Sequence, residues 1–291
     1  MKLTDLSVIR SLLGEEGTSF KKKFGQNFLT NESVVERIAA SALPDIPDPA
    51  EKLGILEIGP GIGVLTQKLS AVAHKVTAVE IDTTLLPILE KTLADCPNVR
   101  VVNNDIMKVD LPALIAEEFP DCTRLAVCAN LPYYITTPIL MALLESKLPF
   151  SSITVMVQKE VAERLCAPAG NDAYGAITAV LHYYGTPKRL FTVSAGNFVP
   201  APKVDSAVVQ IKLHKAPPVA VESEEMLFAV IKAAFGQRRK TLQNALSSLP
   251  SIGKEQVAAA IAAAGFSPTV RGEALDLEGF SKIANLLQTA R

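Results

Sequence analysis

The sequence has no apolar stretch long enough to cross a membrane. No run approaches the roughly 20 apolar residues that a membrane-spanning helix requires. The start of the chain also lacks the apolar core of a signal peptide, because Asp5 and Arg10 lie where that core would be. These absences exclude a membrane-spanning protein and argue against a secreted one. We therefore expect a cytoplasmic protein that makes no membrane contact.

The chain also has few residues that could form disulfides or bind a metal. No two of its four cysteines form a Cys-x-x-Cys pair, and none of its three histidines stands at the spacing of a metal ligand. Cysteines of this kind in a cytosolic protein are usually buried, reduced thiols. We therefore expect no metal site. The cysteines are Cys96, Cys122, Cys128 and Cys166.

An excess of either charge is missing as well. The chain has 29 Lys and Arg against 30 Asp and Glu, a net charge of −1. With 48% apolar and 20% charged residues, its composition excludes a disordered chain. Residues 215–291 carry 9 basic and 7 acidic residues, a small local excess of positive charge. Any surface that binds a nucleic acid must therefore be a local patch.

Short apolar segments alternate with helix-like segments from about residue 30 onward. Continuous apolar strands that alternate with helices predict an α/β fold with a parallel sheet covered on both faces. The first helix is expected at 31–42, where Asn31 is a suitable capping residue. Two later strands come without a full helix between them and predict an antiparallel pair at the end of the sheet. The predicted strands are 55–59, 76–81, 99–102, 125–130, 153–157, 188–193 and 206–213.

The last part of the chain predicts only helices. The segment KAPPV at 215–219 is typical of a linker. An all-helical segment cannot join the sheet, so the sequence predicts two domains, 1–215 and 216–291. The helices expected in the second domain are 225–235, 239–249, 254–266 and 278–288.

A glycine-rich loop follows the first predicted strand. It reads Glu57-Ile58-Gly59-Pro60-Gly61-Ile62-Gly63 and leads directly into a helix. Glycines at such a turn let the backbone reverse and let a ligand approach it closely. Glu80 ends the next strand, where an acidic residue can accept both ribose hydroxyls of a nucleoside cofactor. The dinucleotide fingerprint is incomplete, because Val64 takes the place of its last glycine.

The tetrapeptide Asn130-Leu131-Pro132-Tyr133 ends the fourth predicted strand. Ligands of open α/β sheets lie beyond the carboxyl ends of the strands, so this tetrapeptide faces the same crevice as the glycine loop. It resembles the [DN]-x-P-[YF] motif of amino methyltransferases, and the glycine loop resembles motif I of class I S-adenosylmethionine (SAM) methyltransferases. In this interpretation the Asn130 side-chain oxygen and the Leu131 carbonyl accept the two N–H groups of a base amine. Pro132 fixes the turn, and Tyr133 stacks on the extruded base.

Blocks spread over nearly the whole chain resemble the small-subunit ribosomal RNA adenine dimethyltransferase family (KsgA/RsmA). They include FGQNFL at 24–29, NLPYYITTPIL from Asn130 and AFGQRRKTLQNAL from Ala234. The resemblance implies a Rossmann-like class I methyltransferase sheet with a small C-terminal helical domain. It also implies SAM-dependent methylation of N6 of two adjacent adenines, in a hairpin near the 3′ end of 16S rRNA. The implied substrate is a pre-formed small-subunit particle and the implied enzyme is a monomer linked to subunit biogenesis.

The resemblance also implies site residues. Residues from the FGQNFL block would fold over SAM, and Gly59 and Gly61 would approach it. Glu80 would bind its ribose, Asp105 its adenine, and Asn130 would lie between the methyl donor and the target amine. The first 19 residues match no block and receive no role. The implied SAM-binding residues are Asn27, Leu29, Gly59, Gly61, Glu80, Asp105 and Asn130.

Two basic clusters are candidates for phosphate contacts, Lys21-Lys22-Lys23 beside the FGQNFL block and Arg238-Arg239-Lys240 on a predicted helix. The first triplet can instead be a solvated face, and the second can pair with acids of the large domain. Three other functions remain open. A macrolide-resistance methyltransferase of the large subunit usually reads N-I-P-Y or N-I-P-F. An assembly factor would act by binding alone. A DNA adenine methyltransferase would need a separate target-recognition region.

Overall fold

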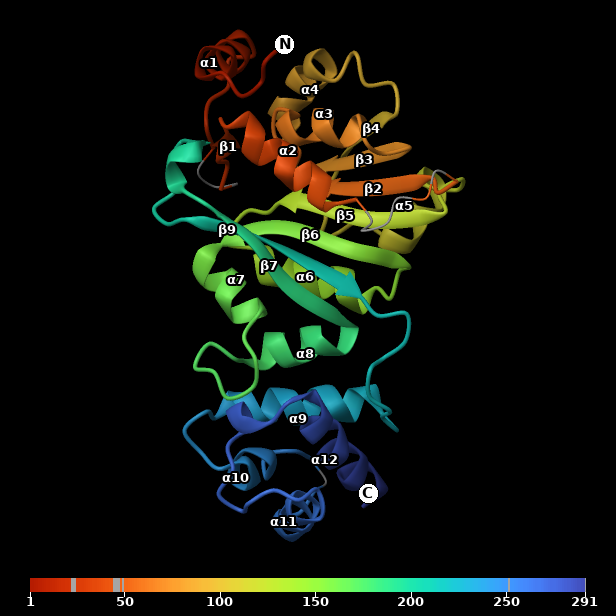
Figure 1. Ribbon diagram of the computed structural model, residues 1–291, viewed down its shortest axis with the longest axis vertical. Helices are drawn as coiled ribbons and strands as arrows, with labels where there is room; N and C mark the ends of the chain where they lie inside the picture. The colour runs from red at the N-terminus through yellow and green to blue at the C-terminus, as the bar shows by residue number, and fades with distance from the viewer. Residues whose placement is uncertain (22–24, 44–47, 49, 251, 291) are drawn as a thin grey trace. The chain divides into compact units, whose positions relative to one another are not determined.

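The computed structural model describes residues 1–21, 25–43, 48, 50–250 and 252–290 (Figure 1). Its internal contacts divide the chain into two compact units. The first unit comprises Met1–Ala162 and Lys188–Leu213, and the second comprises Glu163–Pro187 and His214–Arg291. The second unit therefore contains Glu163–Pro187 in addition to the C-terminal segment that the sequence assigns to a separate domain.

A seven-stranded sheet forms the centre of the first unit. Its strand order is β4-β3-β2-β5-β6-β9-β7. The pairs β2–β3, β3–β4, β2–β5 and β5–β6 are parallel, and β9 is antiparallel to β6. The predicted α/β fold with a largely parallel sheet is confirmed. The strands are β2 (Leu53–Ile58), β3 (Lys75–Glu80), β4 (Val99–Asn103), β5 (Arg124–Asn130), β6 (Phe150–Gln158), β7 (Gly185–Val193) and β9 (Ser206–Leu213).

The central strands are buried because helices cover the sheet. Every residue of β2 is buried, which explains its continuous apolar sequence. Alternate side chains of a strand point to opposite faces, so Ile55 and Glu57 share one face of β2. Ile55 packs there with residues from α2 and α3 in one hydrophobic cluster. The helices of this unit are α1 (Leu6–Glu15), α2 (Glu32–Ser41), α3 (Val64–Ser70), η2 (Thr83–Leu85), α4 (Leu86–Thr92), α5 (Leu111–Glu118), α6 (Thr136–Glu145) and η3 (Ala195–Asn197).

A small second sheet fixes the segment that precedes α2. Strand β1 (Phe28–Leu29) pairs antiparallel with β8 (Phe198–Val199). Asn31 then caps α2 by accepting a hydrogen bond from the Ser33 backbone N–H at 3.1 Å, as its position in the sequence predicts. Helix α1 was not predicted. It is capped by Asp5 and buries Ile9, so the first residues belong to the core of this unit.

The second unit is helical, and its core contains Leu227, Ile231, Phe280 and Ile283. No helix within the described ranges is long and apolar enough to span a membrane. Helix α7 (Lys159–Leu165) runs across the boundary between the two units. The other helices are α8 (Ala176–Tyr184), α9 (Glu224–Gly236), α10 (Leu242–Leu246), α11 (Lys254–Ala263), η4 (Gly272–Ala274) and α12 (Leu277–Thr289).

The helix predicted at 239–249 begins later than expected. Helix α9 ends at Gly236, and α10 begins only at Leu242, after its N-cap Thr241. Gly236 is a poor helix former, and the Thr241 side chain accepts a hydrogen bond from the Asn244 backbone N–H at 3.4 Å, which favours a new helix start. The placement of Arg238, Arg239 and Lys240 on a helix is therefore wrong, because these residues form the turn between α9 and α10.

Candidate functional site

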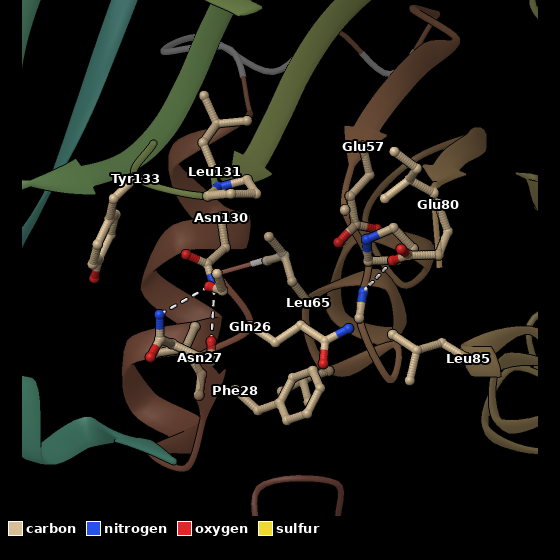
Figure 2. A pocket seen from close by; sticks show the side chains of 18 of the residues that line it. Gln26, Asn27, Phe28, Glu57, Leu65, Glu80, Leu85, Asn130, Leu131 and Tyr133 are labelled. Carbon is tan, nitrogen blue, oxygen red and sulfur yellow. Dashed lines mark hydrogen bonds between the residues drawn. The ribbon is translucent and has the colours of Figure 1, made fainter. Parts of the chain in front are cut away.

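One pocket of the first unit collects most of the side chains that the sequence singles out (Figure 2). It lies at the carboxyl ends of β2, β3 and β5, the edge where parallel sheets usually bind ligands. The segment around β1 contributes further residues to it. The lining residues are Gly25, Gln26, Asn27, Phe28, Leu29, Glu57, Gly59, Pro60, Gly61, Val64, Leu65, Glu80, Ile81, Leu85, Asn130, Leu131, Pro132, Tyr133 and Tyr134.

Three glycines with a positive φ, the third of them Gly63, give the loop after β2 its shape. Gly59 has a φ of 70° and Gly61 a φ of 62°, a region that favours glycine. A Cβ on Gly61 would lie 2.9 Å from the Phe28 ring, so only glycine lets β1 pack against this loop. A Cβ on Gly59 would meet no atom within 4 Å. The backbone at Gly59 is therefore open to a ligand.

Glu80 is held in a fixed position at the end of β3. Its Oε1 accepts a hydrogen bond from the Asp82 backbone N–H at 2.7 Å, and its Oε2 accepts one from the Gly61 backbone N–H at 3.2 Å. Burial raises the pKa of Glu80, and these backbone hydrogen bonds oppose that effect. Each carboxylate oxygen retains a second lone pair. The carboxylate can therefore accept two neighbouring hydroxyl groups without giving up its present partners.

Glu57 also lines the pocket, although the sequence assigned it no role. Only 1% of the residue is exposed, and its Oε2 has no hydrogen-bond partner among the described residues. Burial raises the pKa of Glu57 to about 8, the Thr66 hydroxyl opposes this, and the charge of Glu80 adds to it. Its place at the start of the E-x-G-x-G-x-G pattern was the signal that could have marked it.

Asn130 and Asn27 lie together on the other side of the pocket (Figure 2). The Asn130 amide group donates a hydrogen bond from Nδ2 to the Asn27 carbonyl at 3.3 Å. Asn27 in turn donates from its own Nδ2 to the Gly25 carbonyl at 2.9 Å. These contacts use the nitrogen of the Asn130 amide and leave its oxygen able to accept from a ligand. Leu29 lines the pocket and is 3% exposed.

The rest of the tetrapeptide is anchored to the sheet. The Leu131 backbone N–H donates to the Met156 carbonyl at 3.2 Å. The Tyr133 hydroxyl and the buried Ser206 hydroxyl of β9 are hydrogen-bonded at 2.6 Å. Burial raises the pKa of Tyr133, with Ser206 acting in the opposite direction, so its phenol is neutral. Tyr134, which the sequence did not single out, lines the same pocket and is 63% exposed.

Asp105 is the one predicted SAM-binding residue outside the lining of this pocket. It is half-buried just beyond β4, and its Oδ1 accepts a hydrogen bond from the Met107 backbone N–H at 3.0 Å. An aspartate that accepts from the backbone two residues on forms a local turn. The structure thus places Asp105 at the same sheet edge as Glu80, because β3 and β4 are paired.

Lys21 contacts the protein through its charged end. Its Nζ donates to Asp82 Oδ1 and to Thr84 Oγ1, each at 2.7 Å. Gln26 donates from Nε2 to the other oxygen of Asp82 at 2.9 Å. Burial acts to raise the pKa of Asp82, but these hydrogen bonds outweigh it and lower the pKa. Lys22 and Lys23 lie outside the described residues.

The second basic cluster lies in the second unit. Arg238 donates from Nη2 to the Asp172 carbonyl at 2.9 Å and forms an ion pair with Glu273 at 3.4 Å. Both partners belong to the same unit as Arg238, so these contacts stabilise the turn after α9. Arg239 and Lys240 are exposed.

Nearly the whole chain is similar to known proteins of one family. Residues 17–288 match the profile of a family described as ribosomal RNA adenine dimethylase. A curated relative from Geobacillus thermodenitrificans, named ribosomal RNA small subunit methyltransferase A, is 46% identical over 281 residues, or 96% of this chain and 94% of the relative. A relative of the same name from Streptococcus sanguinis is 47% identical over 292 residues, 99% of each chain.

Solved structures show the same fold. The crystal structure of the 23S rRNA methyltransferase ErmE matches with a TM-score of 0.68 and 25% identity, covering 90% of this chain and all of that one (100%). A dimethyladenosine transferase from Plasmodium falciparum matches with a TM-score of 0.72 and 24% identity, covering 88% of this chain and 95% of that one. The second likeness supports the fold alone.

Proposed function

Since the chain belongs to the ribosomal RNA adenine dimethylase family, we propose that it transfers methyl groups from SAM to N6 of two adjacent adenines near the 3′ end of 16S rRNA. One observation carries this proposal. The glycine loop, Glu80 and the Asn130-Leu131-Pro132-Tyr133 tetrapeptide line a single pocket, so cofactor and amine-binding groups lie together. Relatives named small subunit methyltransferase A support the small-subunit RNA as the substrate.

The residues of the pocket fit SAM, which supplies the methyl group when bound. We assign the methionine end to the open backbone of Gly59. Glu80, fixed by two backbone N–H groups, would accept the ribose hydroxyls. Asn27 and Leu29 would cover the ligand from the side of β1. Asp105 would have to turn its carboxylate from Met107 toward the adenine amino group. The buried Glu57 carboxyl group, whose Oε2 has no hydrogen-bond partner among the described residues, suits the positive charge of SAM.

Asn130 and Leu131 would activate the target amine. The lone pair of an adenine amino group is delocalised into the ring, so nitrogen must become more tetrahedral before it attacks. The Asn130 oxygen is available to accept one N–H because its Nδ2 is held by Asn27. The Leu131 carbonyl would accept the other N–H, and together they stabilise the positive charge that develops on nitrogen. Catalysis then needs no general base, because the alkylated amine loses its proton readily.

Tyr133 would hold the extruded adenine by stacking. Its hydroxyl is bound to Ser206, so the ring has a fixed orientation before RNA arrives. A pre-set ring loses little freedom on binding, and stacking on it is worth about 1–3 kcal/mol per base. Phosphates of the RNA would be contacted by Arg239 and Lys240, and also by Lys22 and Lys23. Arg238 and Lys21 would contribute less, because both already bind acids of the protein.

The experiment that tests this function compares rRNA from cells with and without the protein. Mass spectrometry of the separated small-subunit and large-subunit RNA should show dimethyladenosine missing from the small-subunit 3′ region alone. Re-expression of the wild type should restore it, and re-expression of Asn130→Ala should not. Loss of the modification from large-subunit RNA would instead favour an activity like that of the 23S rRNA methyltransferase ErmE. Unchanged modification of both RNAs, with a defect in subunit assembly, would favour a binding role.

A further inference from the structure

The carboxyl group of Glu57 is buried although it lines the pocket. The residue is the fifth of the six in β2, it is 1% exposed, and its Oε2 has no hydrogen-bond partner among the described residues. Figure 2 shows its carboxyl group on the same side of the pocket as that of Glu80. Burying an ionised carboxylate without a partner is costly, so such a group usually takes up a proton or binds a cation.

The groups around Glu57 favour the protonated form. In the parallel sheet Glu57 is in register with Ala78 of β3 and Cys128 of β5, and Thr66 comes from α3. The charged neighbour is Glu80, which is also acidic, and the buried Cys128 thiol has a raised pKa and is neutral. No basic group in the described ranges contributes to the pKa of Glu57.

Glu80 differs from Glu57 in one decisive way. Both of its carboxylate oxygens accept backbone N–H groups, from Asp82 and Gly61, and these donors favour the ionised form. Within the part of the chain that the structure describes, Glu57 has no such donor on its Oε2. When two neighbouring acids compete for one proton, the acid without hydrogen-bond donors retains it. Of the two acids in the pocket, Glu57 is therefore the one that holds a proton more readily, and Glu80 is the one whose ionised form is stabilised by backbone donors.

We propose that Glu57 carries a proton in the free protein and releases it when the cationic end of SAM binds, so that its carboxylate pairs with the positive charge of the cofactor. This inference rests on the proposed function, because it takes SAM as the ligand. In the step the O–H bond of the Glu57 carboxyl group breaks, the electron pair stays on oxygen, and the proton passes to solvent. The ligand brings the positive charge that replaces it, so the net charge inside the pocket is unchanged.

The same arrangement makes Glu57 a specificity-determining residue. A ligand that places phosphates beside the glycine loop would bring negative charge against Glu80 and would keep Glu57 protonated. Such a ligand gains nothing from releasing the proton. An adenosyl ligand with a sulfonium or ammonium group gains an ion pair in a site from which water is excluded. The two acids thus select cationic adenosyl ligands over adenosine phosphates.

Titration calorimetry of the full-length protein tests the proposal. SAM binding is measured at about pH 7 in phosphate and in Tris, because the difference in heat reports the protons exchanged with the buffer. With half-protonation near pH 8, the wild type should release roughly 0.9 proton more per SAM than Glu57→Gln, which cannot ionise. Any proton that the amino group of SAM itself exchanges contributes equally to both measurements, so it cancels in the difference between the wild type and Glu57→Gln. S-adenosylhomocysteine, which lacks the sulfonium charge, should release fewer protons from the wild type if the sulfonium is the partner.

A matched control is Glu118→Gln. Glu118 is equally buried, but it does not line the pocket and it pairs with Lys75 and Arg100. This substitution should leave proton release on SAM binding unchanged. A second measurement needs no variant. The affinity of the wild type for SAM should rise with pH by up to about tenfold per unit between roughly pH 6 and pH 8.

The outcomes separate this inference from the proposed function. Normal SAM binding with equal proton release in the wild type and in Glu57→Gln would overturn the role of Glu57 and leave the methyltransferase proposal intact. An affinity of the wild type that does not change with pH would do the same. Failure of the wild type to bind SAM at any pH would overturn both.

Discussion

The hydrogen bond between Tyr133 and Ser206 links the tetrapeptide to β9, and its removal should separate stability from catalysis. The two hydroxyl oxygens lie 2.6 Å apart, and Ser206 is fully buried. Tyr133→Phe keeps the aromatic ring but leaves the Ser206 hydroxyl without a partner and out of reach of water. An unsatisfied buried hydroxyl costs about 1–3 kcal/mol, so the free energy of unfolding should fall by that amount.

Ser206→Ala should cost less, about 0.5–1.5 kcal/mol, because the half-buried Tyr133 hydroxyl can still reach water. The double variant should be no less stable than Tyr133→Phe, since the second substitution removes the group that the first leaves unpaired. Urea denaturation of the four proteins measures this cycle. Single-turnover methylation of small-subunit particles then tests the ring. Tyr133→Phe should retain methylation activity with little change in KM, whereas Tyr133→Ala should raise KM by roughly 5- to 150-fold.

Two results would refute this reasoning. Additive changes in stability across the cycle would mean that the hydrogen bond contributes nothing to the fold. An unchanged KM in Tyr133→Ala would mean that the ring does not stack on the target base, whatever its orientation in the free protein. A particle-binding assay on the same variants controls for loss of contacts elsewhere on the RNA.

Glu80→Ala should weaken SAM binding by roughly 10- to 150-fold, because charge-assisted hydrogen bonds to the ribose are lost, and an unchanged dissociation constant would exclude that contact. Asn130→Ala should reduce single-turnover methylation by roughly 10²–10³-fold while particle binding persists, and near-normal methylation would remove Asn130 from the mechanism. Between about pH 5 and pH 8, the wild type should lose about 3 kcal/mol of stability relative to Glu57→Gln. The pKa of Glu57 is raised from 4.5 to about 8 on folding, so its stabilising contribution is complete below pH 4.5 and is lost as the pH rises to about 8. If calorimetry showed the same dependence of stability on pH for the wild type and for Glu57→Gln, this prediction would be contradicted. Arg238→Ala should lower Tm without changing the salt dependence of particle binding. Arg239→Ala should instead lower the slope of log K for particle binding against log salt concentration by roughly 0.7–0.9 and leave Tm unchanged. The opposite pattern would mean that Arg238 contacts RNA and that Arg239 stabilises the fold.

Much of the first unit could be predicted because its signals are local. Continuous apolar segments such as that of β2 report burial on both faces, and a glycine loop reports a turn at a strand end. The edge of the sheet then follows from strand direction, which is why Glu80 and Asn130 could be expected to line one crevice although 50 residues separate them. Site residues that lie at the ends of strands can therefore be predicted from the sequence.

Partners supplied by distant segments could not be predicted in this way. Lys21 finds Asp82 at a separation of 61 residues, and Tyr133 finds Ser206 at a separation of 73 residues. Nothing local marks these pairs, because they arise from tertiary packing. The unpaired oxygen of Glu57 is an equally global property. The turn at Arg238 is different, since Gly236 and Thr241 are local signals, the first of a helix end and the second of a new helix start.

The pairing of β1 with β8 has a consequence for the order in which the pocket is completed. The side chain of Asn31 also bonds to Asn197 across 166 residues of chain, at 2.9 Å. During synthesis, the glycine loop and the tetrapeptide therefore emerge long before β8, the strand that fixes residues 28 and 29. Contacts of such large separation form late in folding. The pocket is closed on its β1 side only in a chain whose sheet is nearly finished, so a ligand held from that side reports that most of the first unit has folded.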